Sequence, residues 1–147
     1  MREILFKAKR KDNGEWVEGG YFSEPYTDKK YIICWNSFGL GLNEFIEIDP
    51  DTLCQYTELT DKNGERIWEN DIVRYTFDYP SEIATENGLK ERISSVFWSE
   101  WRGSWSVYAD ERKSKGMNNE LFEYVRNGNT VEVAGNIFDN PELLEVE

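Results

Sequence analysis

The sequence predicts a mainly β fold with one minor helix, and three observations carry this prediction. An Asn-Gly pair at Asn63-Gly64 lies between two β-prone segments, and such a pair accepts the positive φ angles that tight hairpin turns require. Several short segments alternate apolar and polar residues with the period of two that is typical of a half-buried strand. Aromatic residues make up 15% of the chain, which supplies a core although only 39% of the 147 residues are hydrophobic.

The expected strands are short and are separated by turn residues. They cover residues 4–8, 16–22, 31–35, 45–48, 55–60, 65–77, 92–98, 105–109 and 130–138. Gly19-Gly20 is expected to break or bulge the second strand, and residues 78–89 are expected to form a long loop. One short helix is expected, capped by Asn118 or Asn119 and ended by Asn127-Gly128. Its apolar face is expected to carry Leu121, Phe122 and Val125.

The chain is expected to form two parts, residues 1–50 and residues 51–147. Pro50 holds Asp49 in an extended conformation, which suits a connector between them. The first part is an expected N-terminal β-rich subdomain. Its strands do not obviously complete their own sheet, so we expect it to be an oligomerisation element that pairs with a neighbouring subunit.

The charge of the chain limits its partners. There are 29 acidic and 17 basic residues, giving a net charge of −12. Direct binding to nucleic acid is disfavoured because phosphate backbones are bound through neutralisation by Lys and Arg. The acidity favours solubility, or binding to a basic surface on another protein, including the DNA site of a DNA-binding protein.

No apolar run approaches the roughly 20 residues of a membrane span, so no membrane partner is expected. Cys34 and Cys54 are expected to be reduced thiols in a cytoplasm.

The residue types exclude several chemistries. With no His and two Cys, zinc sites and His-dependent nucleophilic catalysis lack their groups. Asp61-Lys62-Asn63-Gly64 places its glycine too early for a calcium loop, and no Gly-rich phosphate loop precedes a helix. We therefore predict no catalytic residue, no metal site and no cofactor.

One carboxylate alternative remains open. Glu69 and Asp71 would share a face of an extended strand, as a magnesium-dependent nuclease requires. However, neighbouring acids are expected by chance in so acidic a chain. We expect Asp71 to accept hydrogen bonds from backbone amides at the start of its strand, and Glu69 to lie in solvent.

A cluster of aromatic residues is the candidate surface for a partner. It comprises Trp98, Trp101, Arg102 and Trp105. Exposed aromatic residues beside a loop commonly bind a peptide or a base. The alternative is that Trp98 and Trp105 pair across a hairpin and pack inward, which leaves Trp101 at the turn as the exposed residue.

The centre of the chain resembles the signature of the YopX family of small phage and prophage proteins. That signature reads Gln-Tyr-Thr-Gly-Leu, Asp-Lys-Asn-Gly, Ile, and Glu-Gly-Asp-Ile-Val. The matching residues are Gln55-Tyr56-Thr57-Glu58-Leu59, Asp61-Lys62-Asn63-Gly64, Ile67 and Glu69-Asn70-Asp71-Ile72-Val73. Residues 2–8 and 135–144 resemble the two ends of the family. Glu58 and Asn70 stand where the family usually has Gly. Asn tolerates a left-handed backbone, whereas Glu58 implies that its position does not need a positive φ here.

The resemblance implies a fold more than a function. It implies that residues 51–147 form a small SH3-like β-barrel with a short helix and a C-terminal helical turn, and the order of the expected strands is compatible with this. The family as a group has no established biochemical activity. We therefore expect a non-enzymatic accessory protein in the cytoplasm of a bacterial host, which acts by binding itself and a host or phage protein. The alternatives are a Mg²⁺-dependent nucleic-acid-processing enzyme and an acidic DNA-mimic inhibitor.

Overall fold

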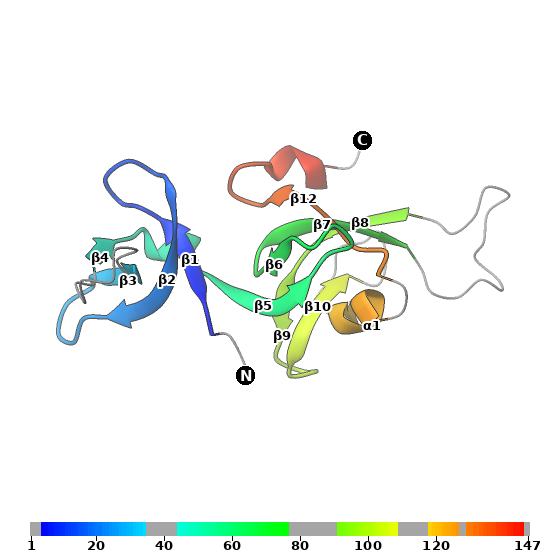
Figure 1. The fold of residues 1–147 in the computed structure, drawn as a ribbon, viewed down its shortest axis with the longest axis horizontal. Helices are drawn as coiled ribbons and strands as arrows, with labels where there is room; N and C mark the ends of the chain where they lie inside the picture. Colours follow the sequence, from blue (N-terminus) through cyan, green and yellow to red (C-terminus); the bar gives the residue numbers. More distant parts are fainter. Residues whose placement is uncertain (1–3, 35–43, 77–90, 109–117, 127–128, 146–147) are drawn as a thin grey trace, which may run out of the picture. The chain divides into compact units, whose positions relative to one another are not determined.

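The computed structural model describes residues 4–34, 44–76, 91–108, 118–126 and 129–145. It confirms the mainly β class, with antiparallel sheets and one short α-helix among these residues (Figure 1). The chain divides into two compact units, Met1–Glu58 and Leu59–Glu147. The predicted loop at residues 78–89 and the predicted helix end at Asn127-Gly128 lie outside the described residues. No helix in the described part of the chain combines the length and apolar character that crossing a membrane requires.

Unit 1 is built on one antiparallel sheet. Its elements are β1 (Phe6–Lys9), β2 (Trp16–Ser23), β3 (Lys30–Cys34), β4 (Glu44–Glu47), the 3-10 helix η1 (Pro50–Thr52) and the first part of β5 (Cys54–Thr60). The strand order is β4-β3-β2-β1-β5. Its core consists of the fully buried Ala8, Ile32 and Ile48, against which Phe6, Val17, Cys34 and Leu53 pack. The alternation predicted for the first strand therefore places Ala8 inside, as the period of two requires.

The first four strands also meet at one end of the sheet. Arg10, just after β1, forms an antiparallel bridge with Ile48, just after β4. The Lys11 amide donates to the Glu47 carbonyl at 3.0 Å, and the Asp49 amide donates to the Lys9 carbonyl at 2.9 Å. The expectation that this part leaves its own sheet incomplete is therefore wrong at this end, because β1 returns to β4.

Gly19-Gly20 does not break the second strand, contrary to our expectation. β2 runs without interruption from Trp16 to Ser23. It pairs with β1 up to Gly19 and with β3 from Gly20 onward. A Cβ at Gly19 would lie 2.1 Å from the carbonyl oxygen of Ile33, so the missing side chain is what lets β3 approach the strand at the point of exchange.

Unit 2 contains two three-stranded antiparallel sheets. Its elements are the end of β5, β6 (Arg66–Trp68), β7 (Asp71–Thr76), β8 (Glu91–Ser95), β9 (Phe97–Ser99), β10 (Ser104–Tyr108), β11 (Asn118–Glu120), α1 (Leu121–Arg126), β12 (Glu132–Asn136) and the 3-10 helix η2 (Pro141–Leu144). The sheets have the orders β12-β7-β8 and β11-β10-β9. Only Val96 separates β8 from β9, so the two sheets share one nearly continuous strand. Within the described residues no ladder joins β11 to β12, so these strands are not seen to close into a barrel.

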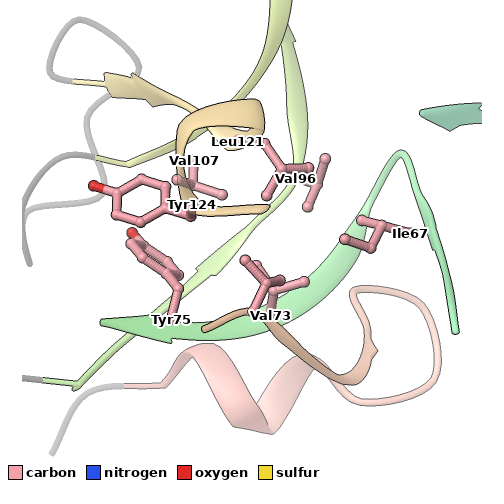
Figure 2. Close-up of a cluster of buried hydrophobic side chains, with 8 residues drawn as sticks. Ile67, Val73, Tyr75, Val96, Val107, Leu121 and Tyr124 are labelled. Carbon is pink, nitrogen blue, oxygen red and sulfur yellow. The ribbon is translucent and has the colours of Figure 1, made fainter. Parts of the chain in front are cut away.

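The core of unit 2 gathers side chains from most of these elements. Its fully or almost fully buried members are Ile67, Val73, Tyr75, Val96, Val107, Leu121, Tyr124 and Val131. Figure 2 shows the rings of Tyr75 of β7 and Tyr124 of α1 next to each other, and their centroids are 4.8 Å apart at an interplanar angle of 57°. The Tyr75 hydroxyl donates to the Tyr108 carbonyl at 2.5 Å. The core therefore ties β7 to both α1 and β10.

The predicted helix exists, but its orientation and its start differ from the prediction. Leu121 and Tyr124 are the buried residues of α1, while Phe122 is 49% exposed. Asn118 and Asn119 belong to β11, which pairs with β10, so the helix begins directly after a strand. The Asn119 side-chain amide instead donates to the Tyr124 hydroxyl at 2.8 Å, which satisfies the polar end of a buried ring.

The Asn63-Gly64 turn is confirmed. Gly64 has a φ of 81°, and its amide donates to the Asp61 carbonyl at 3.0 Å. The strand predicted over residues 65–77 is divided into β6 and β7 by a turn at Glu69-Asn70. Asn70 adopts a φ of 69°, as the resemblance to a glycine position allowed.

Glu58 contradicts our expectation, because its φ is 70° although it is not glycine. For a residue with a Cβ the left-handed conformation costs roughly 1–2 kcal/mol. Glycine would remove this cost, but it loses more conformational entropy on folding, which offsets part of the gain in stability. We predict that Glu58→Gly raises the free energy of unfolding by about 0.5–1 kcal/mol. Urea denaturation measures this change. Glu58→Ala removes the carboxylate and keeps the Cβ, so it should give no such gain, and equal gains from both variants would contradict the backbone explanation.

Candidate functional site

The candidate surface lies on the hairpin of β9 and β10. The turn between them is tight, since the Gly103 amide donates to the Ser99 carbonyl at 2.8 Å and the Arg102 amide donates to the Ser99 hydroxyl at 3.2 Å. Gly103 has a φ of 65°, a conformation that glycine adopts without steric cost. Backbone hydrogen bonds therefore fix the position from which residues 100–102 project.

Trp98 and Trp105 lie directly opposite each other on the two strands. Their ring centroids are 5.1 Å apart at an interplanar angle of 74°, the edge-to-face arrangement that aromatic pairs prefer. Trp105 is partly buried against the core of unit 2. Trp98 remains 47% exposed. The pairing of the two rings across the hairpin is therefore confirmed. The predicted inward packing is found for Trp105, whereas Trp98 is about half exposed.

Trp101 is the most exposed of the three tryptophans, as predicted for its place in the turn. Its side chain is 86% exposed, and the guanidinium carbon of Arg102 lies 5.5 Å from the centre of its ring. That distance is within the range of a cation–π interaction. The exposure of the three rings therefore increases along the hairpin. Trp105 packs against the core, Trp98 packs against Trp105, and Trp101 lies in solvent beside a cation.

The side chains of the hairpin are of types suited to binding. Its distinctive side chains are three indoles and a guanidinium, which contribute apolar area, a π face and hydrogen-bond donors. Trp and Arg are the residue types that dominate the binding energy at protein interfaces. Because the turn is already ordered, a partner that covers Trp101 has to immobilise its side chain but not its backbone.

The carboxylate alternative does not survive in the form proposed from the sequence. Glu69 lies in the turn before β7, so it does not share a strand face with Asp71. Asp71 is 3% exposed, and its carboxylate accepts a hydrogen bond from the Trp68 amide at 2.8 Å. This confirms the structural role expected for Asp71. Glu69 is only partly exposed, and not fully in solvent as expected. The described residues contain no grouping of three or more acids, cysteines or histidines that could hold a metal ion.

Sequence reasoning missed an aromatic cluster in unit 1. Phe22, Tyr31 and Phe45 come from three neighbouring strands, and each ring contacts the other two with centroids 6.1–6.3 Å apart. Phe45 is 57% exposed. These residues alternate with the buried Ile32 and Ile46, so a period of two applied to both faces of the sheet would have found them.

Beside this cluster a cleft of about 330 Å³ opens, lined by residues 10–12 and 44–47. Two ion pairs lie along it: Arg10 with Asp12 at 3.0 Å and Lys11 with Glu47 at 3.0 Å. The hydrogen bond and the charge of Arg10 hold the pKa of the Asp12 carboxyl below its usual value. Burial, with a smaller contribution from Glu44, raises the pKa of the Cys34 thiol. Cys34 and Cys54 are both free, which agrees with the expectation of unpaired thiols.

Comparisons with known proteins agree with the fold. The family model described as YopX protein matches residues 5–145. The chain is also similar to the crystal structure of protein EF1440 from Enterococcus faecalis, with a TM-score of 0.53 and 24% sequence identity over 99% of this chain and 100% of the other. At this identity the likeness concerns the fold alone. No curated protein matches the chain.

Proposed function

The chain belongs to the YopX family, and we propose that it is a phage or prophage accessory protein that acts without catalysis, by binding a protein of the phage or of its bacterial host. The binding surface is the hairpin that carries Trp98, Trp101, Arg102 and Trp105. The protein works in the cytoplasm of the host. Self-association is part of the proposal, and we place it on this surface instead of on residues 1–50, for which the sequence analysis expected it.

The observation that carries this proposal is the exposure of Trp101. Covering a large apolar side chain contributes roughly 2–3 kcal/mol, and the 86% exposed indole forgoes most of this in the isolated chain. Backbone hydrogen bonds to Ser99 hold the turn, so the exposure belongs to an ordered element. A partner that covers Trp101 recovers this free energy without having to order the backbone of the turn.

The surrounding residues support a protein partner over a nucleic acid. The cation beside Trp101 is a single arginine, whereas the whole chain carries a net charge of −12. Such a balance opposes phosphate backbones and is compatible with a partner whose contact surface is apolar with a basic rim. Trp98 would lie at the edge of the covered area, and Trp105 would support it from the core.

We predict that Trp101→Ala weakens partner binding by roughly 30-fold or more, the loss of about 2 kcal/mol that defines a binding hot spot. Immobilised wild-type and variant proteins are exposed to lysate of the bacterial host, and the bound proteins are quantified. Phe122→Ala is the matched control, since Phe122 is a second exposed aromatic residue of the same unit with an arginine, Arg126, over its ring.

The proposal requires that a protein captured by the wild type is lost with Trp101→Ala and kept with Phe122→Ala. Equal capture by all three chains would contradict it. Light scattering tests the self-association part. An oligomer that Trp101→Ala dissociates supports it, and a monomer at high protein concentration removes it while leaving the partner-binding part in place.

A further inference from the structure

The outer edge of β4 exposes backbone hydrogen-bonding groups. The Ile48 amide donates to the Lys30 carbonyl, so Ile48 points its backbone toward β3, whereas the Glu47 carbonyl accepts from the Lys11 amide on the opposite side. Because backbone direction alternates along a strand, Ile46 also points toward β3 and Phe45 points away from it. Within the described residues, the amide and carbonyl of Phe45 have no backbone partner on that side.

The cleft of about 330 Å³ lies along this same edge. The last backbone hydrogen bond between this segment and β4 is the one from the Lys11 amide to the Glu47 carbonyl. The chain then turns away from β4 at Asp12, in a turn that is closed by a hydrogen bond from the Gly14 amide to the Arg10 carbonyl at 2.9 Å. The cleft is therefore the space that opens where the β1–β2 turn departs from β4. One of its walls is an edge of β4 that has no backbone partner at Phe45 in the described part of the chain, and beside that edge the Phe45 side chain is 57% exposed.

We propose that this edge is a second binding site, at which an extended basic segment of a partner protein adds to the sheet as a strand beside β4. The backbone of the segment continues the ladder through the amide and carbonyl of Phe45, as in known modes of strand addition. Its apolar side chains lie on the face of the sheet that carries Phe45, which is 57% exposed, whereas Ile46 on the other face is buried. This site is separate from the tryptophan hairpin of unit 2 and does not depend on it.

The charges favour a basic occupant. Glu47 is paired with Lys11 and Arg10 with Asp12, whereas Glu44 forms no salt bridge among the described residues and interacts with Arg10 only through its charge. Residues 1–58 carry eleven acidic and seven basic side chains. A second copy of the chain would bring another net charge of −12 to the same edge, so self-pairing at β4 is disfavoured relative to a basic segment.

Fluorescence anisotropy with two labelled heptapeptides tests the proposal on the full chain. One peptide alternates Lys with Val, and the other alternates Glu with Val. The decisive variant is Phe45→Pro, compared with Phe45→Ala. Proline removes the outward amide, and it is tolerated in an edge strand where that amide faces solvent. Circular dichroism checks that each variant is folded.

We expect the Lys-Val peptide to bind the wild type, to bind Phe45→Ala more weakly, and to bind Phe45→Pro at least about tenfold more weakly than Phe45→Ala, which corresponds to the loss of roughly one ladder hydrogen bond. The Glu-Val peptide should not bind. A Lys-Val peptide methylated on alternate backbone nitrogens gives the same test without altering the protein, and one of the two methylation registers should abolish binding.

Several results would overturn the proposal. They are absence of Lys-Val binding to the wild type, equal binding to folded Phe45→Pro and Phe45→Ala, equal binding of both methylated peptides and the parent peptide, and equal binding of the Glu-Val peptide. Dimerisation of the wild type that Phe45→Pro abolishes would assign the edge to a second copy and would also overturn it.

Discussion

Gly19→Ala is expected to lower the free energy of unfolding by about 3 kcal/mol or more, because the added methyl group would overlap the backbone of β3. Gly19 is buried, and a Cβ there would lie 2.1 Å from the Ile33 carbonyl oxygen and 2.9 Å from its carbon. Both atoms are backbone, and β3 is held between β2 and β4 by ladders on either side. The strand cannot retreat without breaking hydrogen bonds.

The neighbouring glycine provides the control. A Cβ at Gly20 meets no atom within 4 Å, so Gly20→Ala should change the free energy of unfolding by less than about 0.5 kcal/mol. Urea denaturation followed by circular dichroism measures both variants. Similar losses from the two substitutions would show that flexibility, and not the close approach of β3, explains the glycine pair.

Asp61→Ala is expected to cost about 3 kcal/mol or more in unit 2, because it removes the buried carboxylate that accepts hydrogen bonds from three backbone amides. The Asp61 side chain is 3% exposed. One carboxylate oxygen accepts from the amides of Asn63 at 2.8 Å and Glu65 at 2.9 Å. The other accepts from the Val133 amide of β12 at 3.0 Å. A single carboxylate therefore holds the hairpin turn and attaches it to the last strand.

Two further substitutions separate this network from a simple effect of charge. Asp61→Asn keeps one oxygen but turns an NH₂ group toward either the Val133 amide or the turn amides, so it should also destabilise, by roughly 1–3 kcal/mol. Glu65→Ala removes an exposed acid of the same turn and should be nearly neutral. Thermal and urea unfolding report all three variants. Wild-type stability in Asp61→Asn would contradict the proposed hydrogen-bond network.

Features governed by neighbouring residues were predictable from the sequence. The Asn63-Gly64 turn needs only a backbone that accepts positive φ, and the pair supplies it wherever the chain goes. Trp101 lies at the tip of a turn of a few residues, so it has no strand neighbour to cover it. Asp71 is the first residue of its strand, where a short acidic side chain reaches the nearby amides.

Features that depend on a distant segment were not predictable. The role of Gly19 appears only when β3 is placed beside β2. The inward residues of α1 are Leu121 and Tyr124 and not Phe122, because a helix of six residues is too short for its periodicity to show which face meets the core. Glu58 adopts a conformation that its own side chain disfavours, so the rest of the structure must impose it.

The edge of β4 was also beyond the sequence pattern. The backbone groups of Phe45 face outward there because the β1–β2 turn leaves the sheet before reaching them. The place where this turn leaves the sheet depends on the bridge between Arg10 and Ile48. The sequence showed a strand at residues 45–48 but not which of its amides pointed outward. Only the hydrogen bonds of Glu47 and Ile48 determine that direction.

Hydroxyl-radical footprinting of the wild-type chain, alone and bound to its captured partner, tests the proposed function most directly. The account predicts that oxidation of Trp101 falls several-fold in the complex while oxidation of Phe122 stays the same. Trp101 oxidised equally fast in both states, in a complex that protects another part of the chain, would contradict the assignment of the tryptophan hairpin as the binding surface.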